Sequence, residues 1–470
     1  MEQKTDTSIQ KTDTSMWRAA WRWHFYASFF VLPLLFVLAT SGLVILLKPT
    51  IERFAYNDLL YVDPVAAAVP FDKQQQVVQL EYPNSSIDAV VPPRDTSRST
   101  QFDITTEGGA SRSVYVNPED GEVLGSINND SRIDYVATRI HGTLYLGKWG
   151  DYIIEIAAGW TLVMVFTGLY LWWPRNKIPR RVRSAFAIRL REKGRKRLRD
   201  LHATPGALFA PVLIFLALTG LPWSGFWGTQ WGEFIDKMNS GYNFPSEDPT
   251  SQEHAGAIET PGLQISWANE RMSVPASHLN QSNAQPSLSL EAVTTVAQDI
   301  GMKPGYAVGL PADEIGVFTL SNSWPSPAHD ERTVYLDQYS GDVLAEAGWH
   351  ASYGSLAKGT AWGVDTHMGR QFGLVNGLAM GGSCLAVIGS TITAPLMFFR
   401  RRQPGKSGFP RRPIDAKLSR RITYIAIALG IVFPLLGLSM VFMALLDHFF
   451  IRRVPQLKEL FGMRSDNVVD

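Results

Sequence analysis

Four of the nine histidines occupy positions at which a side chain could bind a metal-containing cofactor. His24 and His202 each lie 18 residues before the glycine of a matching motif, LATSGL and LALTGL, so the two segments share one register. His141 and His367 each lie ahead of another apolar segment. Because imidazoles from two helices can complete the axial coordination of one b-type haem, these four residues are candidate haem-iron ligands.

The four histidines form two pairs when they are assigned to the two ends of the apolar segments. His24 and His202 lie at one end, and His141 and His367 lie at the other. A lone histidine near a membrane interface is more often a hydrogen-bonded anchor, but two pairs related by an internal repeat favour ligation. We therefore predict two haem b groups, one bound by His24 and His202 and one bound by His141 and His367.

The other potential metal ligands narrow the kind of cofactor. The single cysteine, Cys384, lies inside an apolar segment, so no disulfide, four-cysteine iron–sulfur cluster or CxxCH haem attachment can form within the chain. Any haem is therefore held without a covalent link. Of the remaining histidines, two are reserve ligands, His350 and His448, and three are expected to be solvated, His254, His278 and His329.

Five apolar segments are long enough to position these histidines in a membrane. A helix needs about 20 apolar residues to cross a hydrocarbon core of about 30 Å. The five segments are Phe29–Leu47, Tyr152–Trp173, Ala207–Trp227, Leu374–Phe399 and Ile422–Leu446. Glu155 is the single charge within them. The sequence therefore predicts an α-helical multi-pass membrane protein with five transmembrane helices.

The charged residues are sorted between the segments that connect these helices. Segments 175–200 and 400–421 carry 12 and 9 Lys/Arg against 2 and 1 Asp/Glu, whereas segments 48–150 and 228–366 carry 9 and 5 against 14 and 17. Positive charge marks the cytoplasmic side, and basic loops between apolar spans anchor topology rather than bind nucleic acid. We predict a bacterial inner-membrane protein with a cytoplasmic N-terminus and a periplasmic C-terminus.

An internal duplication organises the chain. The external segments repeat VYVNPEDGEVL at 114–124 and VYLDQYSGDVL at 334–344, and each reads as a β-hairpin. The predicted order is a disordered tail at 1–16, transmembrane helices at 17–48, 141–174, 201–227, 367–399 and 422–447, external α+β domains at 49–140 and 228–366, cytoplasmic loops at 175–200 and 400–421, and a periplasmic tail at 448–470.

This order of motifs resembles the PepSY-associated transmembrane family. The motifs that carry the resemblance are Trp23-His24, the two hairpins, TGLYLWWPR, LH followed by TGLPW, and HMGRQFG. The spacing between His141 and the glycines that follow it differs from the spacing after His367. The resemblance implies that the two external domains are small periplasmic PepSY-like domains, and some members of the family resemble ferric-siderophore reductases.

One haem near each face would let the chain carry electrons across the bilayer. The sequence has no dinucleotide-binding or phosphate-binding glycine motif, so quinol or a separate reductase is the expected electron donor. With the family resemblance, the expected acceptor is a periplasmic ferric siderophore or other ferric chelate, which a haem-dependent oxidoreductase would reduce to release Fe(II). Two other functions stay open: a PepSY-type regulator or sensor of periplasmic proteases without redox activity, and a permease.

Overall fold

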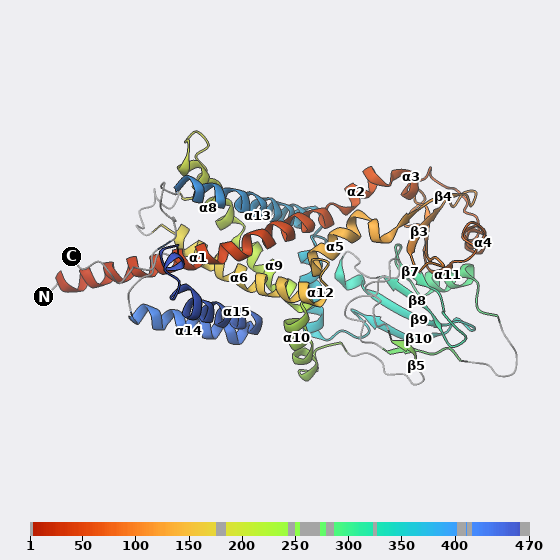
Figure 1. The fold of residues 1–470 in the computed structure, drawn as a ribbon. Helices are drawn as coiled ribbons and strands as arrows, with labels where there is room; N and C mark the ends of the chain where they lie inside the picture. The colour runs from red at the N-terminus through yellow and green to blue at the C-terminus, as the bar shows by residue number, and fades with distance from the viewer. Residues whose placement is uncertain are drawn as a thin grey trace. The chain divides into compact units, whose positions relative to one another are not determined.

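The computed structural model describes residues 3–174, 185–242, 250–253, 273–278, 286–322, 327–401, 410 and 416–460. Within it the chain forms two compact units (Figure 1). Unit one comprises Met1–Leu43, Thr138–Trp231 and Leu378–Asp470, and unit two comprises Val44–Ala137 and Gly232–Gly377. Each unit is therefore assembled from segments that are far apart in the sequence.

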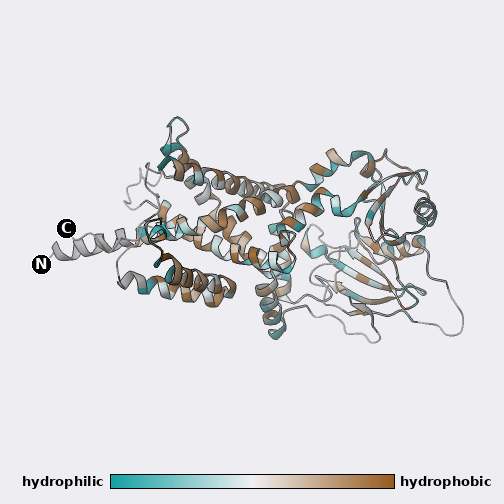
Figure 2. Cartoon of the chain, in the orientation of Figure 1, coloured by the Kyte–Doolittle hydropathy of each residue, from teal (hydrophilic) through white to brown (hydrophobic). Residues whose placement is uncertain are grey.

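Unit one consists of helices, several of which continue into unit two. They are α1 (Gln3–Leu46), α5 (Ile133–Thr143), α6 (Lys148–Trp172), α8 (Arg195–Leu208), α9 (Ala210–Gly220), α10 (Gly225–Lys237), α13 (Gly373–Arg401), α14 (Ala416–Val432), α15 (Pro434–Leu446) and α16 (Pro455–Leu460). Among the described residues, four helical stretches are long and apolar enough to cross a membrane, and the bent pair α8–α9 makes a fifth. Figure 2 shows the apolar residues along these helices. The prediction of a multi-pass helical membrane protein is confirmed at this level.

The third predicted span is bent rather than straight. Helices α8 and α9 meet at an angle of 57° on either side of Phe209. Pro211 lies in the first turn of α9. A proline has no N–H to donate and its ring clashes with the carbonyl four residues earlier, so Pro211 favours a bend between α8 and α9. The bend places His202 on a helix that begins at Arg195, well before the predicted apolar segment starts at Ala207.

The fifth predicted span, Ile422–Leu446, is wrong as a single helix. Helices α14 and α15 are separated at Phe433, where Pro434 starts α15, and they lie side by side (Figure 1). A β-carbon built on Gly437 would lie 2.6 Å from the Cα of Gly430. In one continuous helix, residues seven apart are about 10 Å apart along the axis. The segment is therefore a helical hairpin that two facing glycines allow to close.

The hairpin also affects the position of the residues at the end of α15. Asp447, directly after α15, lies within electrostatic reach of Tyr26 on α1. Tyr26 is two residues from His24, which was assigned to the cytoplasmic end of the first helix. Within unit one, the end of α15 is thus close to the part of α1 that carries His24. The side of the membrane on which the tail lies stays a prediction from sequence.

Unit two is built around one antiparallel sheet. Its strand order is β10-β9-β8-β7-β1-β2-β3-β4. The strands are β1 (Ser86–Val91), β2 (Thr100–Thr105), β3 (Ser111–Val116), β4 (Val123–Asn128), β7 (Ala307–Gly309), β8 (Val317–Asn322), β9 (Arg332–Asp337) and β10 (Val343–Gly348). The remaining elements are α2 (Lys48–Ala55), α3 (Asn57–Leu60), α4 (Phe71–Glu81), α11 (Leu290–Asp299), α12 (Ser355–His367) and a two-stranded ribbon of β5 (Thr250–Glu253) and β6 (Ser273–Pro275). The strands of both predicted external segments thus share a single sheet.

Both predicted hairpins are confirmed as antiparallel pairs, β3 with β4 and β9 with β10. Their turns have the same hydrogen bonds: Gly121 N–H donates to the Asn117 carbonyl, and Gly341 N–H donates to the Asp337 carbonyl. Gly121 and Gly341 have φ angles of +80° and +78°. Glycine adopts this left-handed backbone without the steric penalty of a β-carbon, which explains why both turns contain it.

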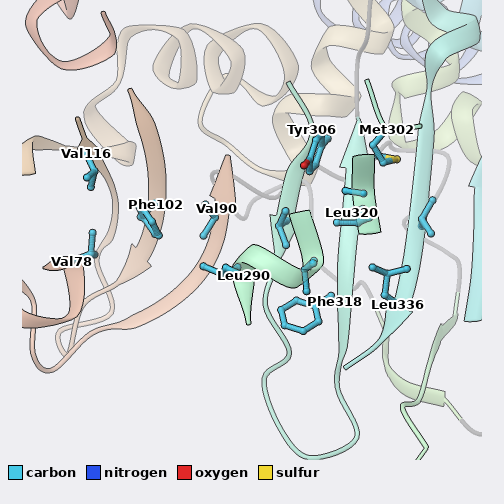
Figure 3. Packing of buried hydrophobic residues seen from close by; sticks show 14 of the residues in the cluster. Val78, Val90, Phe102, Val116, Leu290, Met302, Tyr306, Phe318, Leu320 and Leu336 are labelled. Atoms are coloured by element: carbon cyan, nitrogen blue, oxygen red, sulfur yellow. The ribbon is translucent and has the colours of Figure 1, made fainter. Parts of the chain in front are cut away.

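The two halves of the sheet have the same order of elements. In each half a helix, α4 or α11, precedes four strands in sequence order, and the halves meet where β1 pairs with β7. The helices cap each other: Leu290 N–H donates to Asp72 (2.8 Å) and Phe71 N–H donates to Glu291 (3.0 Å). Both helices pack against one shared apolar core, part of which Figure 3 shows. Unit two is thus one folded body rather than two separate domains.

Asp103 of β2 is a buried carboxyl group in this sheet. It accepts hydrogen bonds from Ser113 Oγ (2.5 Å) and Gln101 Nε2 (3.0 Å). Burial nevertheless raises the pKa of Asp103 to about 6. In the unfolded chain the pKa is about 4, so the folded state binds the proton more tightly, and this group destabilises the fold progressively as the pH rises through that interval.

We expect Asp103→Asn to stabilise the protein at pH 8, by up to about 3 kcal/mol in the free energy of unfolding. The gain should shrink by about half at pH 5 and vanish below pH 4, because the wild-type carboxyl is then protonated in both states. Thermal unfolding at several pH values measures this, with Glu119→Gln in the exposed neighbouring turn as the control. A gain that does not depend on pH would contradict the assignment.

Candidate haem sites

His24 on α1 and His202 on α8 lie together within unit one. Their ring centres are 6.3 Å apart and their ring planes make an angle of 83°. A metal–imidazole bond of about 2 Å and a further 1 Å or so to the ring centre would separate two imidazoles on opposite sides of one ion by about 6 Å. The distance between these rings therefore fits one haem iron bound between them.

The hydrogen bonds of His24 fix which of its nitrogens carries the proton. Nδ1 lies 2.9 Å from the carbonyl oxygen of Met164 and 3.2 Å from the hydroxyl oxygen of Thr167, both on α6. A carbonyl oxygen can only accept, so Nδ1 of the neutral ring is the protonated donor. The lone pair is then on Nε2, the nitrogen that binds a metal in such histidines. A β-carbon on Gly168 would lie 3.0 Å from His24 Cε1, so the ring packs directly on the helix backbone.

His202 has a similar but looser environment. Its Nδ1 is buried and makes no hydrogen bond of good geometry to any residue that the structure describes. The backbone carbonyl of Ser390, on α13, is close to the His202 ring. A buried polar atom without a hydrogen bond is costly, so the ring of His202 is held less firmly than that of His24.

His141 on α5 is held in the same way as His24. Its Nδ1 lies 3.0 Å from the carbonyl oxygen of Leu38 and 3.1 Å from the hydroxyl oxygen of Ser41, both on α1. A β-carbon on Gly42 would lie 3.1 Å from His141 Cε1. Nδ1 is again the donor, and Nε2 has the lone pair that a haem iron requires.

His367 is the last residue of α12, in unit two. The turn that follows it is fixed by Asn376, whose Nδ2 donates to the Thr366 carbonyl (2.9 Å), and by the ion pair between Arg370 Nε and Asp365 Oδ1 (3.2 Å). Burial raises the pKa of Asp365 and lowers that of Arg370, because the loss of water outweighs their mutual attraction. His141 belongs to unit one, so its pairing with His367 stays a prediction from sequence.

The comparison with protein families shows to which family the chain belongs. The model of the PepSY-associated TM region matches residues 21–401. The chain belongs to this family. The matched region contains all four candidate ligands and ends before the α14–α15 hairpin. No curated protein matches the sequence.

The other histidines of this PepSY-associated membrane protein differ from the four candidates in exposure. All four candidates are half-buried, whereas every other histidine that the structure describes is exposed: His278, His329, His350 and His448. His254 lies outside the described residues. Neither reserve ligand, His350 or His448, is thus enclosed by helices. Nor do three or more His, Cys, Asp or Glu side chains gather into a metal-binding group among the described residues.

Glu155 is a residue to which the sequence alone assigned no role. It lies on α6, is 5% exposed, and accepts hydrogen bonds from the backbone N–H groups of Phe226 and Trp227, both at 3.1 Å. These groups belong to the first turn of α10, where N–H groups have no partner within the helix and the helix dipole attracts negative charge. The one charge within the apolar segments therefore holds the start of α10. In the sequence, the one feature that could have pointed to this role of Glu155 was its isolated charge within an apolar segment.

Proposed function

We propose that this PepSY-associated membrane protein binds two b-type haems and passes electrons to a ferric chelate, such as a ferric siderophore, to release Fe(II). The observation that carries the proposal is the pair His24 and His202, whose ring centres are 6.3 Å apart. The Nδ1 hydrogen bond of His24 to a carbonyl, which leaves Nε2 to coordinate, supports it. The proposal makes the protein a haem-dependent oxidoreductase.

The residues of the chain would hold the cofactors as follows. His24 and His202 would hold one haem, and His141 would hold the second, with His367 as the partner that the sequence suggests. Each haem would supply a one-electron carrier. The Nδ1 hydrogen bonds of His24 and His141 to neighbouring helices would keep these two rings in a fixed orientation.

The proposed topology follows the charge sorting, with one change. The protein lies in the inner membrane. Its N-terminus and the basic loops at 175–200 and 400–421 are cytoplasmic, and the segments of unit two lie in the periplasm. Because α14 and α15 form a hairpin, the tail from His448 is assigned to the cytoplasmic side as well. Quinol or a separate reductase donates electrons, and the ferric chelate is met at the periplasmic face.

The chemistry of the acceptor explains why reduction releases iron. Oxygen ligands such as hydroxamates are hard and bind Fe(III) much more tightly than Fe(II). One electron taken from the protein converts the chelate to Fe(II), and no bond of the chelator is broken. The donor in turn restores that electron to the protein.

We expect the reduced wild-type protein to be reoxidised by a ferric hydroxamate. Dithionite-reduced protein in right-side-out vesicles would be mixed anaerobically with the membrane-impermeant chelate and ferrozine, and the haem bands should return to the oxidised form as ferrozine colours. The matched control is the gallium complex of the same chelator, which has the same shape and charge but is not reduced under these conditions. The proposed acceptor is wrong if ferric and gallium complexes behave alike while quinone reoxidises the protein promptly. Purified protein without haem would instead favour a regulatory role.

A further inference from the structure

Four membrane helices share one local hydrogen-bond pattern. In each, a Ser or Thr hydroxyl donates to the carbonyl four residues earlier at 2.7–2.8 Å and lies 3.1–3.4 Å from the carbonyl three residues earlier. Hydroxyls often bond back to the helix in this way, so the pattern alone has no functional meaning. The four residues are Ser41, Thr167, Thr219 and Thr393.

Two of these hydroxyls also face a candidate haem ligand. Ser41 Oγ lies 3.1 Å from Nδ1 of His141, and Thr167 Oγ1 lies 3.2 Å from Nδ1 of His24. In both cases the carbonyl three residues before the hydroxyl, Leu38 or Met164, approaches the same nitrogen. The two histidines thus have matching sets of contacts, although they lie on different helices.

The residue after each hydroxyl completes the set. Gly42 follows Ser41, and Gly168 follows Thr167. β-carbons at these glycines would lie 3.1 Å from Cε1 of His141 and 3.0 Å from Cε1 of His24. Such distances are too short for a side chain without movement of the ring, so glycine is what allows each ring to reach the oxygens. We call this set of carbonyl, hydroxyl and glycine the histidine cradle.

A third helix has part of the same set. The backbone carbonyl of Ser390 on α13 is close to the imidazole ring of His202. Thr393 follows three residues later, with the same bonds to its own helix, and Ala394, the next smallest residue, stands where the other two helices have glycine.

We propose that Ser41 and Thr167 are positioning residues that fix the tautomer and orientation of the haem ligands His141 and His24. Each hydroxyl proton is committed to the carbonyl four residues earlier, so the oxygen can only accept from the imidazole. Two acceptors then face Nδ1, which excludes the tautomer with the proton on Nε2, because its Nδ1 lone pair would meet two oxygen lone pairs. Nε2 is left to coordinate iron, and the hydrogen bonds raise its basicity. This inference rests on the proposed function.

The test compares Thr167→Val, which keeps the shape of the side chain and removes the hydroxyl, with Thr167→Ser, which restores the hydroxyl. Thr161→Val is the matched control, because Thr161 is buried on the same helix and donates only to the Ala157 carbonyl. The measurements are the rate at which haem transfers to apomyoglobin and the midpoint potential of each haem. A second variant, Ser41→Ala, tests the other cradle.

For Thr167→Val we expect the affinity for one haem to fall about 10- to 100-fold, as for other groups that orient a ligand histidine, and its midpoint potential to rise. The potential rises because a weaker hydrogen bond at Nδ1 leaves the imidazole a poorer donor to ferric iron. Thr167→Ser and Thr161→Val should resemble the wild type. The cradle is overturned if Thr167→Val has two haems with wild-type transfer rates and potentials. Wild-type protein without haem would overturn the proposed function and the cradle together.

Discussion

Replacing His24 with alanine is expected to leave purified protein with one haem per chain where the wild type has two. His202 then faces the open coordination position alone, so the haem is lost or becomes high-spin with a single imidazole ligand. His202→Ala should have the same effect, and the double variant should lose no more than either single one, because both residues serve one iron. The other haem should stay low-spin in all three variants.

Two measurements can detect the loss of this haem. The pyridine haemochrome assay counts haems per chain, and electron paramagnetic resonance identifies the one that is missing. Because the ring planes of His24 and His202 make an angle of 83°, two orbitals of an iron bound between them would be nearly equivalent in energy. The wild type should therefore show a highly anisotropic low-spin signal that disappears in His24→Ala.

The exposed histidines of the chain supply the controls. His278→Ala and His350→Ala should keep two haems, because both side chains are in solvent. The assignment fails if His24→Ala still binds two haems with the wild-type signal, or if His350→Ala loses one. In the second case the axial ligand would be a residue outside the helices.

The sequence predicted the membrane helices well where apolar length alone decides the structure. The helices α1, α6 and α13 follow from apolar runs that have to satisfy their backbone hydrogen bonds internally. The fifth segment shows the limit of this reasoning. Hydropathy is the same whether a chain continues or folds back, and the hairpin depends on a tertiary contact between Gly430 and Gly437.

In the sheet of unit two, too, some features could be predicted from the sequence and others could not. The turns at Gly121 and Gly341 could be read from local sequence, because a left-handed residue between short β-rich runs has few alternatives. The pairing of β1 with β7 could not, because it joins strands more than 200 residues apart through only a short register, Ala89 with Gly309 and Val90 with Val308. The duplication itself stays a prediction, supported by the matching order of elements.

The candidate site was found from the histidines, but the residues around them were missed. The register shared by His24 and His202 was enough to predict that they come together, as their rings do. Ser41 and Thr167 were not noticed because a hydroxyl on an apolar helix usually bonds only to its own backbone. A signal was nevertheless present: Ser-Gly-Leu or Thr-Gly-Leu occurs at 41–43, 167–169 and 219–221.

The glycines of the cradle give the second large expected effect. Gly168→Val should remove the haem of His24 and His202, and Gly42→Val should remove the haem bound by His141. A β-carbon at either position already comes within 3.0–3.1 Å of the ring, and the γ-carbons of valine would enter the space of the ring itself. Because a ligand has to stay within about 0.5 Å of its productive position, a ring displaced by a side chain cannot coordinate.

Each glycine variant should thus lose a different haem. Gly168→Val should lack the highly anisotropic signal of the His24 and His202 pair, whereas Gly42→Val should retain it, and the haemochrome assay should give one haem per chain for both. Gly359→Val is the matched control, because Gly359 is also helical but a β-carbon there would meet no atom within 4 Å. It should keep two haems. If both variants lost the same haem, or if both kept two haems with unchanged spectra, the two rings would not be the separate ligands that the cradles hold in place.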